Sequence, residues 1–149
     1  MSNDIVDHLK SLHTSAIDAR NGYQEALKDA DGNEMTPLFG EMMALHQRHA
    51  DELASELRNA GEIPDEKGSF MTVIHETIMD VRSMFNGLDE SVLPGLIDGE
   101  NRNASKYDDA LKALVTTPSV VGLLSGQREN IIQKIAGMEE QKSAKESAA

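Results

Sequence analysis

The feature that most constrains this chain is an apolar period of three and four residues that recurs along nearly its whole length. In the first thirty residues the repeating positions are Ile5, Leu9, Leu12, Ala16, Ala19, Tyr23, Ala26 and Ala30. This spacing places the side chains on one face of an α-helix, and that face must be buried against another element. No stretch alternates apolar and polar residues in the way that a half-buried strand does. The chain is therefore expected to be all-α.

Capping and turn residues divide the pattern into five helices. The boundary signals are turn residues at 29–34, Thr36-Pro37, Gly61 with Pro64, Ser69, Asn86-Gly87, Ser91 and Thr117-Pro118. Short polar connections between helices are typical of antiparallel bundles. We expect a four-helix bundle over residues 1–116 and a further C-terminal helix over 117–142, which packs on the bundle or on a partner chain. A polar, flexible tail is expected over 143–149.

The charge of the chain excludes several classes of partner. Its formal net charge is -12, so nucleic acid and anionic membrane surfaces should both be repelled. There is no cysteine, which excludes disulfides and thiolate metal sites. No secretory signal and no apolar run of membrane-spanning length is visible. These features predict a cytoplasmic protein that binds neither nucleic acid nor membrane.

Three polar residues fall on stripes that are otherwise apolar. His46 and His49 lie one turn apart on the second helix, and Glu100 lies between Ile97 and Ala104 on the fourth. A buried carboxylate is costly unless it is paired or ligates a metal. Imidazole and carboxylate together suit a single Zn or Fe ion, with His75 beside the third stripe as a further ligand. The alternative is that these side chains only make hydrogen bonds at packing edges.

The other histidines and the glycines suggest no chemistry. His8 and His13 lie off the main stripe of the first helix and are expected at the surface or its boundary. The sequence contains no GxSxG nucleophile motif, no phosphate-binding GxxxxGK[ST] loop and no HExxH zinc motif. We therefore assign no catalytic residue.

Four short segments resemble a bacterial family of ferritin-like four-helix bundles that is classed as a domain of unknown function. They are NGYQEA (21–26), ADELASEL (50–57), Gly68-Ser69 and DGENRNASKYDDAL (98–111). The resemblance covers about residues 4–115 and leaves the fifth helix as an extension. It implies a ferritin-like bundle, no established activity, and a link to stress or metal handling.

Ferritin-like dinuclear enzymes use one Glu from each of two helices and a Glu-x-x-His pair from each of the other two. No Glu-x-x-His occurs on these helices: the second has His46-x-x-His49, and the fourth has Glu100-x-x-Asn103. We therefore expect a non-catalytic, self-associating bundle, most simply a homodimer. Two alternatives remain open: a bundle that binds one Zn or Fe ion, and a helical protein-interaction module that uses the apolar stripe of the fifth helix.

Overall fold

The computed structural model describes residues 3–30, 34–67, 90–113 and 117–148. These residues form four long helices, α1 (Asn3–Ala30), α2 (Thr36–Asn59), α4 (Leu93–Ala113) and α5 (Pro118–Ala148). A single 3-10 turn, η1 (Glu90–Val92), leads into α4. The described residues include no strand, and the all-α prediction is confirmed. The predicted third helix, which contains His75, lies outside the described residues.

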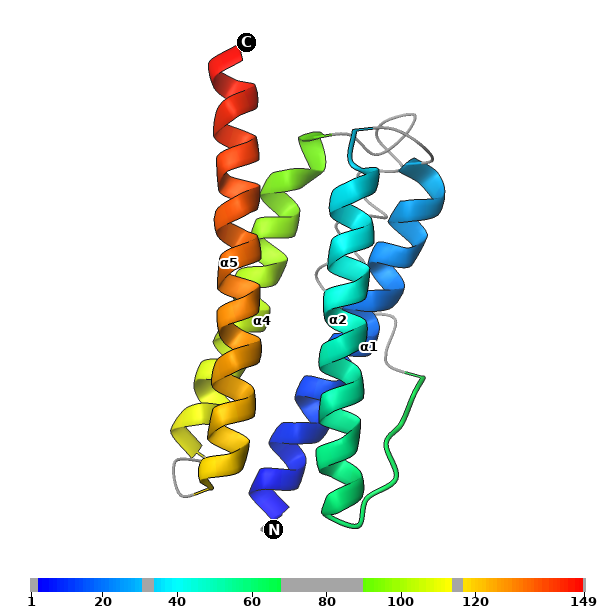
Figure 1. The fold of residues 1–149 in the computed structure, drawn as a ribbon, viewed down its shortest axis with the longest axis vertical. Helices are drawn as coiled ribbons and strands as arrows, with labels where there is room; N and C mark the ends of the chain where they lie inside the picture. Colours follow the sequence, from blue (N-terminus) through cyan, green and yellow to red (C-terminus); the bar gives the residue numbers. More distant parts are fainter. Residues whose placement is uncertain (1–2, 31–33, 68–89, 114–116, 149) are drawn as a thin grey trace.

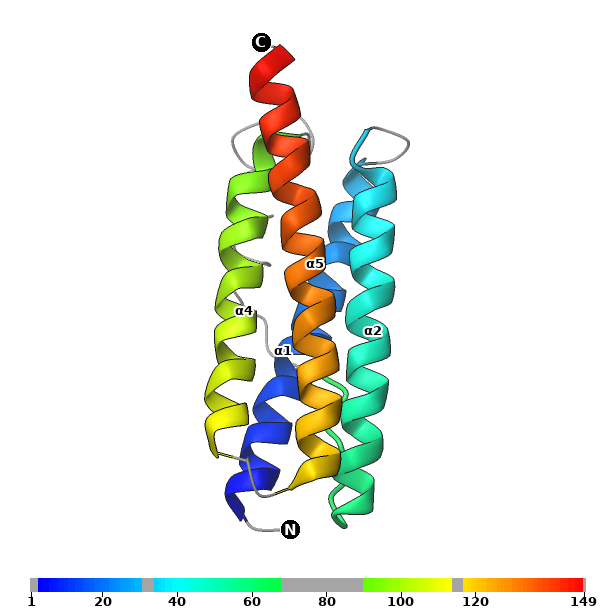
Figure 2. The same ribbon diagram turned by 60° about the vertical axis from the view of Figure 1, so that its left-hand side comes forward.

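The four long helices form an antiparallel bundle (Figures 1 and 2). α1 packs mainly on α2 and α4 mainly on α5, while α1 also contacts α4 and α2 contacts α5. Each of these neighbouring pairs runs antiparallel, so α2 and α4, at opposite corners, run in the same direction (Figure 1). The end of α2 and the start of α4 therefore lie at opposite ends of the bundle.

The apolar stripes that the sequence predicts for α2 and α4 form part of the core. On α2 the buried side chains include Phe39, Met42, Leu53 and Leu57. α4 buries Leu93, Ile97, Ala104 and Tyr107, which the sequence also predicts. Two helix starts differ slightly from expectation. Met35 rather than Thr36 precedes the first turn of α2, and the turn η1 comes before α4 where Ser91 was expected to cap it.

α5 differs from the sequence-based prediction in extent and in register. It continues to Ala148, although a flexible tail is predicted from residue 143. It lies against α4 and α2 as one of the four long helices that the structure describes. Its buried positions include Val120 and Gln127, where the sequence pattern places Val121 and Arg128.

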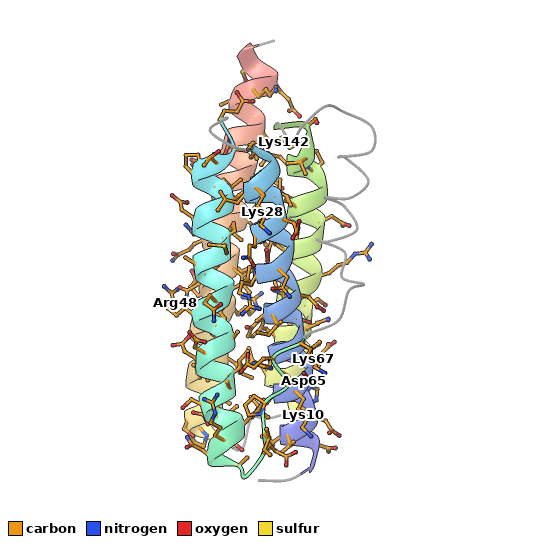
Figure 3. All side chains as sticks on the ribbon, turned by 90° about the vertical axis from the view of Figure 1, so that its right-hand side faces the viewer. Lys10, Lys28, Arg48, Asp65, Lys67 and Lys142 are labelled. Atoms are coloured by element: carbon orange, nitrogen blue, oxygen red, sulfur yellow. The ribbon has the colours of Figure 1, made fainter. Side chains whose placement is uncertain are left out.

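The segment after α2 runs beside α1. Gly61 has a φ of 84°, a left-handed conformation that suits glycine at the end of a helix. Lys10 on α1 then pairs with Glu62 at 2.6 Å, and Figure 3 shows Asp65 and Lys67 on the same side of the molecule as Lys10. In the described part of the chain, no helix combines the length and the apolarity that crossing a membrane requires.

Candidate functional site

Glu100 lies at the centre of a buried polar cluster. Its carboxylate is fully buried, and a buried charge is stable only where hydrogen bonds or an opposite charge compensate for lost water. The Tyr23 hydroxyl donates to Glu100 Oε2 at 2.9 Å. His46 Nε2 lies 2.8 Å from Oε2 and 3.2 Å from Oε1. Helices α1, α2 and α4 thus meet through one side chain from each.

The contact with Glu100 involves one nitrogen of the His46 ring. An ionised carboxylate only accepts hydrogen bonds, so Nε2 is the donor wherever Glu100 is ionised. Among the described residues, Nδ1 of the same ring is buried without a hydrogen-bond partner. The Tyr23 ring stacks on the His46 ring, with centroids 5.8 Å apart and planes 9° from parallel. Burial raises the pKa of Tyr23 well above its usual value and the nearby Glu100 carboxylate raises it further, so the phenol is protonated.

His49 extends the cluster toward α5. Its ring meets the His46 ring edge-on, with centroids 6.1 Å apart. The amide nitrogen of Asn130 lies 3.3 Å from His49 Nε2, while His49 Nδ1 is buried without a hydrogen-bond partner among the described residues. Burial, with smaller contributions from the neighbouring His46 and Arg48, lowers the pKa of His49 to about 3. His49 is therefore a neutral imidazole at physiological pH.

Gln127 on α5 hydrogen-bonds residues of both α4 and α2. Its Oε1 accepts a hydrogen bond of 2.7 Å from the Tyr107 hydroxyl. Its Nε2 donates to the His49 carbonyl at 3.3 Å and to Glu52 Oε1 at 3.1 Å. Gln127 is 2% exposed and Glu52 lies at the surface. The Gln127 side chain therefore bonds both to buried groups and to a carboxylate at the surface of the bundle.

Six of these residues form what we call the polar layer: Tyr23, His46, His49, Glu100, Gln127 and Asn130. α1 and α4 contribute one residue each, while α2 and α5 each contribute a pair with i, i+3 spacing. Residues with this spacing share a helix face, which explains why both members of each pair reach the same interior. Glu100 is the one carboxylate among the six.

The structure brings together some of the residues singled out in the sequence. His46 contacts Glu100, and His49 lies beside His46. His75 lies outside the described residues. Within the described ranges, no three or more His, Asp or Glu side chains gather closely enough to hold a metal ion. Metal binding by these residues therefore stays a prediction.

Two expectations about individual residues are corrected. His13, expected at the surface or its boundary, is only 2% exposed. Its Nε2 has no hydrogen-bond partner in the described part of the chain, where Glu66 Oε2 lies 3.9 Å away. The sequence reasoning also missed Gln127 and Asn130, because it placed Arg128 on the buried stripe. Arg128 instead pairs with Asp108 on α4 at 2.6 Å. The signal that could have identified them is Gln-x-x-Asn, which repeats the spacing of His46-x-x-His49.

Comparisons with known proteins agree with this architecture. Across the whole chain the structure resembles Rhodobacter capsulatus bacterioferritin, described with a metal-free dinuclear site and a haem iron. The TM-score is 0.83 at 13% identity, and 89% of the bacterioferritin chain is covered. No curated protein matches the sequence. Residues 4–113 match the family model described as Domain of unknown function (DUF2383). The chain therefore belongs to the DUF2383 family and has a ferritin-like four-helix bundle fold.

Proposed function

We propose that this protein is a non-catalytic, metal-handling bundle of the cytoplasm that holds a single transition-metal ion, Zn or Fe, at Glu100 and His46. The observation that carries the proposal is the contact of a fully buried carboxylate with a fully buried imidazole, at 2.8 Å. Carboxylate oxygen and imidazole nitrogen are the donors that both metals accept. His49 supplies a further buried nitrogen next to the pair.

The charge of the polar layer supports one ion rather than two. Bacterioferritin is described with a dinuclear site, and dinuclear sites in ferritin-like proteins draw on four carboxylates. The polar layer repeats that arrangement of single residues and i, i+3 pairs, but only Glu100 is anionic. Two divalent ions would leave a large positive charge without compensation in a buried site, which is strongly unfavourable.

The distances in the cluster fit a single bound ion. With metal–ligand bonds of about 2.0–2.2 Å in a tetrahedral site, two ligand atoms lie about 3.4 Å apart. His46 Nε2 lies 2.8 Å and 3.2 Å from the two carboxylate oxygens of Glu100. Replacing the shared proton by an ion therefore requires shifts of a few tenths of an ångström. His46 Nδ1, which lacks a partner, can take the proton that Nε2 gives up.

The test is metal titration of protein purified without a histidine tag. Metal-free protein is titrated with Co²⁺, a spectroscopic substitute for Zn²⁺, and stoichiometry is measured by calorimetry and elemental analysis. We expect one ion per chain, with binding lost in Glu100→Gln and in His46→Ala. His8→Ala is the matched control, because His8 lies on α1 outside the polar layer. Two ions per chain, or unchanged binding in both site variants, would contradict the proposal.

A second candidate is a bundle that binds no ion. It is favoured by the hydrogen bonds that Glu100 already receives from Tyr23 and His46. In that case the cluster fixes the packing of α1, α2 and α4, and the protein acts through association with itself or a partner. The same titration separates the candidates, because a bundle of this kind gives no saturable binding while the site variants still lose stability.

A further inference from the structure

The segment that follows α2, residues 61–67, runs beside α1, and we call it the strap. Charged side chains attach it to the bundle: Glu62 pairs with Lys10 of α1 at 2.6 Å, and Glu66 lies 4.0 Å from Arg58 of α2. Ile63, the large apolar side chain of the strap, is 93% exposed and therefore does not anchor it. Because exposed ion pairs contribute little to stability, these contacts hold the strap weakly.

His13 of α1 lies next to the strap and is almost sealed from water. Its side chain is 2% exposed, and its Nε2 has no hydrogen-bond partner among the described residues. Glu66 Oε2 lies 3.9 Å from this nitrogen, so a movement of about 1 Å would bring the two atoms to hydrogen-bond distance. The Glu66 side chain is 58% exposed and can rotate without displacing packed residues. On α4, which also contacts α1, Lys106 is engaged with the Ser15 hydroxyl at 2.6 Å.

Other charged groups act on the same imidazole ring. Burial is the largest influence on His13 and lowers its pKa, and the Glu66 carboxylate is the largest of those that raise it. Asp65 on the strap also raises this pKa, whereas Arg58 on α2 and Arg20 on α1 lower it. Glu66 is therefore the group whose movement best compensates a proton on His13.

We propose that the strap is a pH-sensitive clasp: when His13 takes up a proton, Glu66 closes on its Nε2 and holds residues 61–67 more firmly against α1. A protonated imidazole and a carboxylate form a charge-assisted hydrogen bond, which is stronger than a neutral one. Closure requires only the rotation of an exposed side chain, whereas bringing His13 into water requires α1 to give up a buried position. Neither residue belongs to the polar layer, so this inference does not depend on the proposed function.

Linkage gives the direction of the response. The pKa of His13 is higher with Glu66 closed on the ring than with Glu66 turned away, because the carboxylate stabilises the charged imidazole. The closed state therefore gains population as the pH falls. A difference of one in this pKa corresponds to about a tenfold change in the ratio of closed to open strap. Burial still makes a proton on His13 costly for the folded protein, so acid weakens the bundle while it tightens the strap.

The experiment follows the mobility of the strap with a nitroxide spin label. The chain has no cysteine, so Ile63→Cys provides a single attachment site that projects into solvent. We expect the paramagnetic resonance spectrum to broaden as the pH falls from about 7.5 to about 5, which spans the usual pKa of histidine. The broadening should be absent when His13→Gln or Glu66→Gln is added. A label at Ser55→Cys, an exposed position on α2, is the matched control and should show no change.

Nuclear magnetic resonance of the histidine rings measures the pKa of His13 directly, and His13→Gln identifies its signal. Glu66→Gln should lower this pKa, whereas Glu139→Gln, at an exposed position on α5, should leave it unchanged. A strap that becomes more mobile in acid, or that does not respond to pH, overturns the proposal. A response that persists in His13→Gln also overturns it, as does an unchanged pKa of His13 in Glu66→Gln, a surface substitution that should not disturb folding.

Discussion

At the scale of single residues, Glu100 is a fully buried carboxylate, which is costly unless hydrogen bonds compensate for lost water. Tyr23 and His46 both donate to it, and the site is sealed from water. Glu100→Gln keeps the shape of the side chain but presents an amide NH₂ group to one of these donors. We expect the free energy of unfolding of the metal-free protein to fall by about 1–3 kcal/mol, because a buried polar group loses its partner. Urea denaturation measures this change.

The control for that substitution is Glu139→Gln on α5, where the side chain is exposed. Such a surface change should stay within about 0.5 kcal/mol of the wild type. Equal losses in the two variants would mean that the hydrogen bonds to Glu100 contribute nothing specific to stability.

His13 should make the stability of the protein depend on pH. Burial lowers the pKa of His13 below its usual 6.5, while Glu66 and Asp65 act in the opposite direction. The unfolded chain therefore takes up a proton at a higher pH than the folded chain does. Stability is complete above about pH 6.5 and declines below it, by up to about 1.4 kcal/mol per pH unit for one proton.

The measurement is a series of urea denaturations across this pH range on the wild type and His13→Gln. We expect the free energy of unfolding to decline less steeply with falling pH in the variant. The decline that remains comes from His49, because its pKa is also lowered in the folded state, to about 3. An unchanged slope in His13→Gln would show that His13 does not contribute to the decline.

A residue of the site can be identified from the sequence only if it interrupts the apolar pattern. The positions of His46, His49 and Glu100 follow the three-and-four spacing of apolar residues, but their side chains are polar. They can therefore be identified without a structure. Tyr23 fits the pattern as a core residue because its ring is apolar. Its hydroxyl acquires a role only when α4 places Glu100 2.9 Å away, and pairing between distant helices cannot be read from one stripe.

At the scale of elements, α5 shows how a stripe can be read one residue out of register. The apolar positions of the helix, Leu124, Ile131, Ile135 and Met138, are compatible with two buried faces. One face also contains Val120 and Gln127, and the other contains Val121 and Arg128. Hydrophobicity does not show which of the two valines, or which of the two polar side chains, is buried. The hydrogen bonds of Gln127 to Tyr107 and to the His49 carbonyl select the observed register, and those partners lie on other helices.

Removal of α5 should unfold the bundle. Val120, Leu124, Ile131 and Met138 are all fully buried, and each such side chain contributes about 1.5–3 kcal/mol. Together they account for about 6–12 kcal/mol, which is comparable to the whole stability of a typical domain, about 5–15 kcal/mol. A chain that ends at residue 116 should therefore lose cooperative unfolding and bind dyes that recognise exposed apolar surface.

A shorter truncation provides the control for this experiment. The side chains of residues 143–147 are all exposed, so removing residues 143–149 should leave cooperative unfolding intact. A chain ending at residue 116 that stays soluble and unfolds cooperatively would instead support the reading of α5 as an appendage to a complete bundle.

At the scale of the whole molecule, capping and turn residues predict about where the described helices begin and end along the chain, but they do not predict the directions of those helices. Each stripe predicts that a helix is buried without identifying the helix that covers it. The parallel relation of α2 and α4 is seen only in the structure. So is the contact between Glu100, near the middle of α4, and His46, near the middle of α2, because neither stripe identifies its partner.

The net charge of -12 should govern how the protein associates with itself. Like charges on two copies repel each other, and salt screens that repulsion over about 8 Å at physiological ionic strength. Among the described residues Ile63 is the one large apolar side chain that is strongly exposed, at 93%, so no broad apolar patch there offsets the repulsion. We therefore predict that the homodimer expected from the sequence forms more readily as salt is added. Light scattering after size-exclusion chromatography at low and high NaCl measures this. A dimer that dissociates in high salt would instead be held by ion pairs, and a monomer at every salt concentration would rule out self-association under these conditions.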